Sequence, residues 1–293
     1  MKPLKKIAVL FFSFLLFIPT SQAQEQGGPK LWSLSDDDTT IYIMGTIHIL
    51  TKDVDWFRPG IKEAFEGSEA LILELGPEQE DPAIIQPLIV KYGLLKGGET
   101  LKTLLSKEDY IRLSKALTGL GTPGNALDTL QPWLAATFLT VQVAANHGFL
   151  PQYGVEKILE KSAKKRGIPI QGLETAEYQI AILASLSPEN QNIYLSLTLD
   201  ELDLVEDIFI EMRDAWVAGD TETLDALINQ GTEEIPGFAE AILYQRNRNW
   251  VGDLTELLEV PGQYFVAVGT GHLVGANNLI ALLREAGFEV TVD

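Results

Sequence analysis

The chain contains no cysteine and only three histidines among its 293 residues. The absence of cysteine excludes disulfide bonds and thiolate ligands, so a metal ion could be bound only through imidazole, carboxylate or amide groups. Basic residues are also scarce, because 22 Lys and Arg stand against 41 Asp and Glu, for a formal net charge of −19. A protein of that charge repels a phosphate backbone, so we expect no nucleic-acid partner.

Long apolar runs are missing except at the N-terminus. There, residues 1–23 place three lysines before an apolar stretch and end on Ser21-Gln22-Ala23, a small-x-small sequence. This order of features is typical of a signal peptide, and we predict its removal after Ala23. No later segment has the roughly 18 uninterrupted apolar residues of a membrane-spanning helix. We therefore expect a mature protein without a transmembrane span, located in the periplasm or secreted.

Six short apolar segments have the composition of β-strands. They cover residues 31–34, 40–44, 70–75, 168–172, 263–268 and 288–292. Amphipathic patterns of helical period fill the stretches between the third and fourth segments and between the fourth and fifth. This distribution predicts an α/β fold in which a central mixed sheet is flanked by helices. We expect one domain over residues 24–293, with a helical lobe inserted at about 81–160.

Two of the three histidines end the same kind of tetrapeptide after a strand-like segment. His48 closes GTIH (45–48) and His272 closes GTGH (269–272). Glu74 lies near the end of a third segment and Glu174 follows the fourth after Gly172, and an apolar strand that ends in a carboxylate must expose it or give it a partner. Because ligands of open α/β sheets gather at the carboxyl ends of strands, we predict that these four side chains meet in one cleft.

Each of these residues also has a plainer interpretation on its own. A histidine after a strand can be a hydrogen-bonding turn residue, and Glu174 can favour the start of a helix through the helix dipole. Both histidines follow glycine-bearing turns at the edge of the sheet, so we expect their replacement by alanine to leave the fold nearly intact. The third histidine, His147, precedes Gly148 and fits a helix end outside the site.

Several segments together resemble one known family. GTIH, LILELG, GLETAEYQ, QRN (245–247) and VAVGTGHLVG followed by LIALLREAGFEV resemble the TraB/GumN (TraB–PrgY–GumN) family, which is related to the Tiki-type metalloproteases. The resemblance runs from about Leu31 to the C-terminus. It implies an erythromycin-esterase/ChaN-like α/β fold. By way of the Tiki-type proteins, it also implies a divalent-metal-dependent peptidase activity that uses two histidines and a glutamate.

The resemblance implies roles for individual residues. Carried over by motif, the metal ligands are His48, Glu74 and His272, and the further pocket residues are Glu174, Gln179, Arg246 and Asn247. The helical run around Arg246 is equally consistent with a solvated helix face. Two positions depart from the family's pattern, because Tyr178 stands where a second acidic residue is expected and Glu156 stands where an aspartate is usual.

These residues predict an exported, peptidase-like hydrolase that acts on a peptide or small-molecule substrate. Two imidazoles and a carboxylate suit a divalent ion such as Zn, Mn or Co, which would lower the pKa of a bound water molecule. Glu174 or Glu74 would then act as general base. The chain has no HExxH sequence, so the site is not that of a zincin and its ligands must come together over long range.

Two other functions remain open at this point. The family includes proteins associated with inhibiting peptide pheromones, where sequestration of a peptide would replace its cleavage. The related ChaN-like fold also suggests a haem- or iron-binding protein, by analogy alone. A peptidase needs an ordered ion and a base, a sequestering protein needs only the cleft, and haem needs an apolar slot with an axial ligand.

Overall fold

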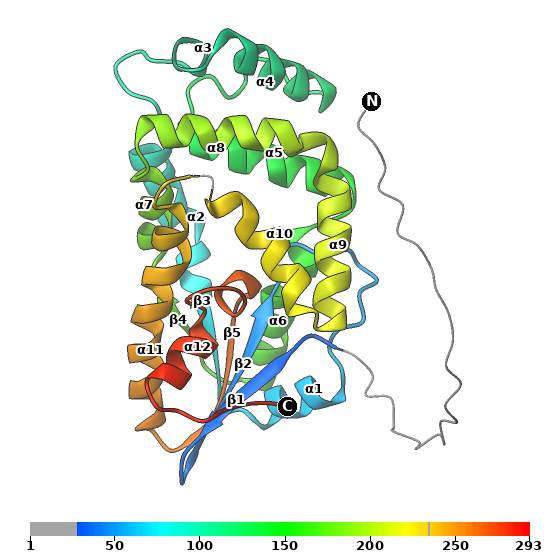
Figure 1. Cartoon of the computed structure of the whole chain (residues 1–293), viewed down its shortest axis with the longest axis vertical. Coiled ribbons are helices and arrows are strands. Elements are labelled where there is room, and N and C mark those ends of the chain that lie inside the picture. Colours follow the sequence, from blue (N-terminus) through cyan, green and yellow to red (C-terminus); the bar gives the residue numbers. More distant parts are fainter. Residues whose placement is uncertain (1–27, 234) are drawn as a thin grey trace, which may run out of the picture.

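The computed structural model describes residues 28–233 and 235–293 of the chain. The predicted signal peptide, residues 1–23, lies outside these residues. A six-stranded mixed sheet occupies the lower half of the molecule in Figure 1, and helices cover its faces and the upper ends of its strands. Within the described residues, no helix combines the length and the apolar composition that crossing a membrane requires.

The sheet has the strand order β4-β3-β5-β2-β1-β6. Its strands are β1 (Leu31–Ser35), β2 (Thr39–Thr46), β3 (Ala70–Leu75), β4 (Ile170–Glu174), β5 (Gly262–Gly269) and β6 (Val290–Val292). Strands β4, β3, β5 and β2 are parallel, whereas β1 is antiparallel to both β2 and β6. The predicted α/β class and mixed sheet are therefore confirmed, and each of the six predicted segments overlaps one of these strands.

The fourth strand begins later than the sequence pattern predicts. Gly167 has a left-handed conformation, with φ of 74°, at the end of α6 (Val155–Arg166). The N–H of Ile168 then donates to the carbonyl of Ala163, 3.2 Å away, which closes the helix end. Pro169 has no N–H to donate to a sheet. Residues 168 and 169 therefore belong to the helix cap and the turn that follows it.

Alternate residues of the central strands face two separate apolar cores. In β5, Phe265 and Ala267 pack on one side of the sheet, where α1 (Pro59–Gly67) and α6 lie. Val266 and Val268 pack on the other side, where α11 (Gln245–Leu258) and α12 (Leu279–Glu285) lie. A strand buried on both faces has a continuous apolar sequence. The two cores hold the strands in register, because a slip of one residue would exchange the faces.

The remaining helices lie between the strands along the chain. They are α2 (Pro82–Leu88), α3 (Leu101–Leu104), α4 (Lys107–Gly119), α5 (Pro132–Asn146), α7 (Ala176–Ala184), α8 (Pro188–Glu201), α9 (Val205–Ala218) and α10 (Thr221–Glu233). Shorter helical turns are η1 (Pro77–Glu80), η2 (Ile89–Gly93), η3 (Pro151–Tyr153), η4 (Leu202–Leu204), η5 (Glu240–Tyr244) and η6 (Thr270–His272). Helices α2 to α6 follow β3, and α7 to α11 follow β4.

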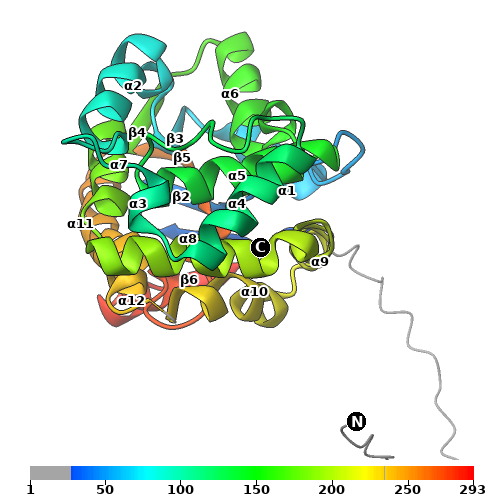
Figure 2. The ribbon, with the colours of Figure 1, turned by 90° about the horizontal axis from the view of Figure 1, so that it is seen from above.

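Four helices form a layer above the carboxyl ends of the strands. Helices α3, α4, α5 and α8 share an apolar core that includes Leu113, Leu139 and Leu195. Figure 2 shows this layer from above, with α2, α7 and α11 along one side and α1 and α9 on the other. Of the helices in the lobe predicted at about 81–160, α3 to α5 contribute to this layer, whereas α6 packs against the sheet through Leu159. The lobe and its boundaries stay predictions, as does the single domain.

Candidate functional site

The carboxyl ends of four neighbouring strands carry the main predicted site residues. Because β4, β3, β5 and β2 are parallel, their ends meet at one edge of the sheet, below the helical layer (Figure 1). His48 and His272 follow β2 and β5, and Glu74 and Glu174 lie at the ends of β3 and β4. The topology therefore brings together residues that are far apart in the sequence.

Glu74 accepts hydrogen bonds at both carboxylate oxygens. Oε1 accepts from the N–H of Gly269, 2.7 Å away. Oε2 accepts from Nη2 of Arg246 at 2.5 Å and from Nε2 of Gln179 at 3.0 Å. Burial by itself raises the pKa of this carboxyl group. The neighbouring imidazoles, first of all that of His272, act with the guanidinium and the backbone N–H to hold the pKa at about 2. Glu74 is therefore a carboxylate at neutral pH.

His272 is buried, with 3% of its surface exposed, and both ring nitrogens have partners. Nδ1 lies 2.6 Å from Oδ1 of Asn247, whose Nδ2 donates to the carbonyl of Asn277 and so fixes the amide orientation. Nε2 lies 2.9 Å from Nη1 of Arg246, which can only donate. Burial lowers the pKa of His272 to about 3 and outweighs the attraction of Glu74. The ring is therefore neutral, with its hydrogen on Nδ1.

Arg246 connects both glutamates to His272. Its Nε donates to the oxygens of Glu174 at 2.9 and 3.0 Å, and its Nη2 donates to Glu174 at 2.7 Å and to Glu74 at 2.5 Å. Its Nη1 donates to Nε2 of His272 and to the carbonyl of Ile242, each at 2.9 Å. A guanidinium has five N–H donors. These contacts use all of them.

Two further side chains enclose this cluster. The ring centre of Trp250, on α11, lies 4.9 Å from the guanidinium carbon of Arg246 and 4.3 Å from the ring centre of His272. Gln179, on α7, donates to both glutamates at 3.0 Å. Arg246 is 8% exposed and Asn247 is 1% exposed. The solvated helix face that the sequence left open for α11 is therefore wrong at these two positions.

His48 lies at the edge of the cluster, with 68% of its side chain exposed. Its Nδ1 is 2.6 Å from Oε1 of Glu156, and the same oxygen accepts from the hydroxyl of Thr46 at 2.5 Å. Attraction to Glu156 raises the pKa of His48 to about 9, although burial opposes the shift and water screens an exposed pair. Because the carboxylate binds Nδ1, Nε2 is the nitrogen that a metal ion could bind, once it has lost its proton.

The sequence shows Glu156 only as a departure from the family's pattern, whereas the structure shows it as the partner of His48. A Cβ at Gly154 would come within 2.1 Å of the carbonyl oxygen of His48. Glycine therefore allows α6 to begin against the loop that follows β2. This close approach places Glu156, in the first turn of α6, beside the imidazole. A glycine two residues before an acidic residue, at the start of a helix, is the sequence signal for this contact.

A position without a side chain lies at the centre of these groups. A Cβ at Gly269 would lie 3.0 Å from Oε1 of Glu74, 3.5 Å from Nε2 of His48 and 3.7 Å from Cδ2 of His272. Three groups from three strand ends therefore surround one point, which glycine keeps free of a side chain. The structure brings together the three residues that the resemblance implies as metal ligands.

Two of the proposed donor atoms, one from Glu74 and one from His272, are spaced to fit a divalent metal ion, on one condition. Oε1 of Glu74 and Nε2 of His272 lie 3.8 Å apart, and two ligands about 2.1 Å from one ion are at most about 4.2 Å apart. Across residues 28–233 and 235–293, no three His, Cys, Asp or Glu side chains already form a metal-binding group. The condition is that Nη1 of Arg246 leaves Nε2 of His272, because one nitrogen electron pair cannot serve both.

Tyr178 and His147, which the sequence also singles out, contact residues outside the cluster. Tyr178 is 37% exposed, and its hydroxyl lies 3.5 Å from Nδ2 of Asn249. His147 follows the last residue of α5, as predicted for a helix end, and lies 2.9 Å from the carboxylate of Glu206 on α9. His147 therefore links two helices of the molecule.

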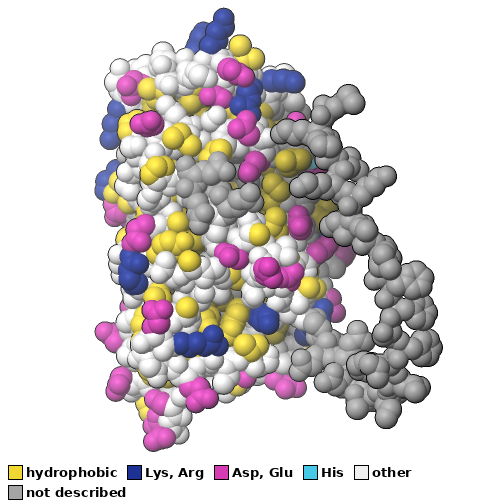
Figure 3. Space-filling view, in the orientation of Figure 1, with side chains coloured by type: hydrophobic (Ala, Val, Ile, Leu, Met, Phe, Trp, Pro, Cys, Tyr) yellow, Lys and Arg dark blue, Asp and Glu magenta, His cyan; other side chains and the backbone are white. Residues whose placement is uncertain are grey.

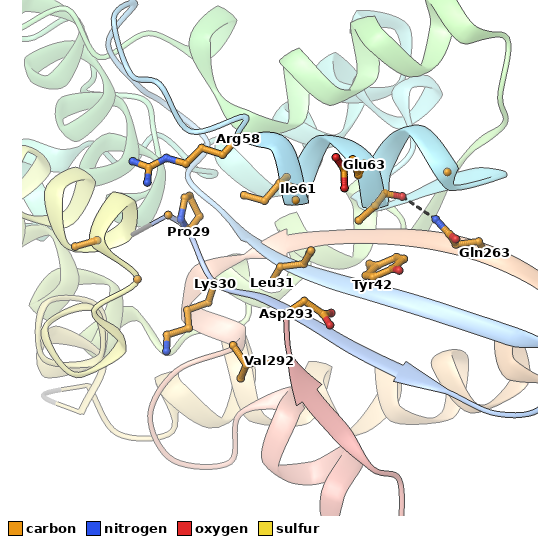
Figure 4. A pocket seen from close by; sticks show the side chains of 16 residues that line it. Pro29, Lys30, Leu31, Tyr42, Arg58, Ile61, Glu63, Gln263, Val292 and Asp293 are labelled. Atoms are coloured by element: carbon orange, nitrogen blue, oxygen red, sulfur yellow. Dashed lines mark hydrogen bonds between the residues drawn. The ribbon is translucent and has the colours of Figure 1, made fainter. Parts of the chain in front are cut away.

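A cavity of about 710 Å³ lies apart from the cluster, between α1, the segment before β1 and the end of β6 (Figure 4). Strands β1 and β2 form its floor. Side chains of both charges stand around it, namely Lys30, Arg58, Glu63 and Asp293. None of its lining residues belongs to the cluster described above. The cavity and the cluster are therefore separate features.

The chain is similar to proteins of bacteria and vertebrates. It is 26% identical to the "Uncharacterized protein YbaP" of Escherichia coli (strain K12), over 91% of this chain and 98% of that protein. It is also 26% identical to "Metalloprotease TIKI1" of Danio rerio, over 92% of this chain and 64% of that protein. For "Metalloprotease TIKI1" of Homo sapiens the identity is 24%, over 94% of this chain and 67% of that protein. The chain therefore spans about two thirds of the length of these TIKI relatives.

No solved structure matches the chain, so the erythromycin-esterase/ChaN-like arrangement stays a prediction from the resemblance. The sequence profile of the TraB/PrgY/gumN family matches residues 30–292. This match covers nearly all of the described residues. The chain therefore belongs to the TraB/PrgY/GumN family.

Proposed function

We propose that this chain is a divalent-metal-dependent hydrolase that acts on peptides and is exported to the periplasm or secreted. One observation carries the proposal, which is that His48, Glu74 and His272 surround a single point beside Gly269. Relatives named as metalloproteases support an activity of this class. The order of basic, apolar and small residues over 1–23 supports export.

His48, Glu74 and His272 would hold the ion, and this set of ligands suits Zn, Mn or Co. A bound ion of this kind lowers the pKa of a water molecule and polarises a carbonyl group. Glu156 and Asn247 each bind Nδ1 of one histidine. Each contact keeps a hydrogen on Nδ1 and leaves Nε2 as the nitrogen for the ion. At His48, whose pKa is raised, the ion would displace a proton from Nε2.

The two glutamates have different surroundings, which separates their proposed roles. Both oxygens of Glu174 accept from Arg246, and Oε2 accepts from Gln179 as well. Glu174 is therefore the counter-ion that holds the guanidinium. Oε1 of Glu74 faces the point beside Gly269. The geometry therefore favours Glu74, and not Glu174, as the carboxylate that acts as metal ligand or as general base.

The overall charge of the protein favours the approach of cations. The formal net charge is −19, and on the face shown in Figure 3 acidic side chains are spread among lysines and arginines. A negative surface raises the local concentration of divalent cations and of positively charged ligands. We therefore propose neutral or basic peptides as substrates, in preference to acidic ones.

Metal analysis of the purified mature protein tests the proposal, followed by digestion of a peptide library with and without a chelator. We expect a bound or readily bound divalent ion and cleavage that stops on chelation and returns with added Mn, Co or Zn. His48→Ala is the inactive comparison, and His147→Ala is the matched control. Cleavage that persists at full rate after complete removal of metal would contradict a metal-dependent mechanism.

A peptide-sequestering module is the second candidate function. It needs a cleft without an ion, and the contact between Arg246 and Nε2 of His272 favours it, since this contact occupies one ligand position. The same digest separates the two functions. A sequestering protein would bind peptides from the library and release them uncut with every metal.

A further inference from the structure

The contact between Arg246 and His272 has a consequence for metal binding, if the chain has the proposed metal-dependent function. An unprotonated imidazole nitrogen has a single in-plane electron pair, which either accepts a hydrogen bond or binds a cation. Nη1 of Arg246 lies 2.9 Å from that nitrogen of His272, and Nη2 lies 2.5 Å from Glu74. The guanidinium thus satisfies two of the three side chains that would hold the ion.

We propose that Arg246 is an internal competitor of the metal ion. Its guanidinium neutralises the buried carboxylates when no ion is bound, and its Nη1 withdraws from His272 when the ion enters, while Glu174 continues to hold the rest of the group. Arg246 is then a positioning residue that sets the affinity of the site for metal. In this arrangement Glu174 does no proton transfer, because it must hold the displaced arginine.

The surroundings of Arg246 allow this exchange. The contacts with Glu174 use Nε and one hydrogen of Nη2, and the carbonyl of Ile242 uses one hydrogen of Nη1. These bonds do not compete with an ion and can persist. Trp250 lies against the guanidinium at 4.9 Å and favours a cation at that position. The one contact that must open is that between Nη1 of Arg246 and Nε2 of His272, because Nη2 binds Oε2 of Glu74 and not the Oε1 that faces the point beside Gly269.

Electrostatics explain why a competitor would be retained. The side chains of Glu74 and Glu174 are 13% and 5% exposed. Two carboxylates so deeply buried need a positive charge nearby at all times. Arg246 supplies that charge before the ion arrives, and a divalent ion supplies it to Glu74 afterwards. Removal of the arginine should therefore strengthen metal binding while it weakens the metal-stripped protein.

The experiment measures metal affinity by calorimetry, with MnCl₂ and ZnCl₂ titrated into chelator-treated full-length mature protein. Arg246→Met removes the competing donors, and Arg246→Lys retains a charge without the fork that reaches both Glu174 and His272. Arg248→Met is the matched control, because Arg248 lies on the same helix and pairs with the exposed Glu240. We expect both Arg246 variants to bind metal at least about ten times more tightly than the parent, and the control to bind like the parent.

The outcomes separate this inference from the proposed function. Unchanged or weaker binding by both Arg246 variants, with clear binding by the parent, would overturn the competition and leave the metal site standing. If parent and variants all fail to bind either ion, the proposed function fails and the inference fails with it. Thermal unfolding provides a second measurement. We expect the loss of Tm in Arg246→Met to shrink when metal is saturating, whereas a purely structural arginine gives an equal loss with and without metal.

A measurement on the parent protein keeps the test valid if a variant does not fold. Nitrogen-15 spectra of the side chains report on the guanidinium of Arg246 and the ring of His272 during a Zn²⁺ titration. We expect the signals of Nε2 of His272 and Nη1 of Arg246 to shift together, while the Nε–H signal of Arg246 persists because Glu174 still holds it. A bound ion that leaves the Nη1 signal unmoved would overturn the exchange.

Discussion

Oε1 of Glu156 lies 2.6 Å from Nδ1 of His48 and also accepts a hydrogen bond from the hydroxyl of Thr46. Glu156 therefore connects the first turn of α6 to the end of β2 and the loop after it, and it orients His48, the exposed member of the three proposed ligands. A carboxylate on the far nitrogen of a ligating histidine fixes its tautomer and makes the ring a better ligand. Loss of this partner should therefore weaken the site without touching the metal-facing atoms.

Glu156→Gln should lower metal affinity about 10–100-fold, the usual effect of removing such a partner. The amide has the same shape but no charge. Calorimetric titration with Zn²⁺ checks the prediction, and Glu160→Gln on the same helix is the control. Glu156→Asp, which keeps the charge, should retain more affinity than the amide variant. Equal binding by parent and Glu156→Gln would mean that His48 needs no orienting partner.

The pair also predicts a pH dependence in chelator-treated protein. Glu156 raises the pKa of His48 from 6.5 to about 9 in the folded state. The stability contributed by the pair is therefore complete below pH 6.5 and is lost as the pH rises through about 9. Urea unfolding across this range should show the gap between parent and Glu156→Gln closing as the pH rises. A difference in the free energy of unfolding that widens as the pH rises would contradict the prediction.

The two histidines should differ in their effect on stability, although both substitutions should abolish metal binding and hydrolysis. His48 is exposed, so His48→Ala should change the free energy of unfolding by less than about 1 kcal/mol. His272 is buried against Trp250 and binds both Asn247 and Arg246. His272→Ala should cost about 2–4 kcal/mol, from a cavity and unpaired polar groups. Urea titrations of both variants, with His147→Ala as control, measure the difference.

The sequence predicts the strand ends well and the helix contacts poorly. The apolar pattern of β5 needs only its neighbours in the sheet, so GTGH is correctly placed at the end of a buried strand. His272 is buried, so the turn that follows β5 does not have the exposure behind the expectation that His272→Ala leaves the fold nearly intact, and we expect a loss of stability instead. Burial of His272 depends on α11, whose sequence shows charged residues on several faces.

The role of Arg246 is also invisible in the local pattern. Its partners Glu74 and Glu174 are 172 and 72 residues away in sequence, and helical periodicity reports only on neighbours three or four residues apart. The contact between His48 and Glu156 has the same character, since it depends on the close approach that Gly154 permits. Ion pairs between distant segments can be recognised only once the sheet has brought those segments together.

Glu74→Gln should separate the two roles proposed for this carboxylate. Oε1 faces the point beside Gly269, so we expect the amide to lower metal affinity, as for a ligand. If Glu74 is the general base instead, metal stays bound while turnover falls about 10²–10⁴-fold. Metal content and peptide cleavage are measured on the same sample. Glu78→Gln, in the exposed turn that follows β3, is the control and should match the parent in both.

Gly269→Ala is the most direct test of the site, because it changes no donor atom. The new methyl group would lie 3.0 Å from Oε1 of Glu74 and 3.5 Å from Nε2 of His48, in the space that the ligands share. The residue has φ of −51° and ψ of 135°, a conformation open to alanine, so the fold should be retained. We expect metal affinity to fall at least about tenfold, which corresponds to about 1.4 kcal/mol, and peptide cleavage to fall with it. Gly252→Ala, on α11 where an added Cβ meets nothing within 4 Å, is the matched control. A Gly269→Ala variant that binds metal and cleaves peptides like the parent would show that the ion, if present, lies somewhere other than among His48, Glu74 and His272.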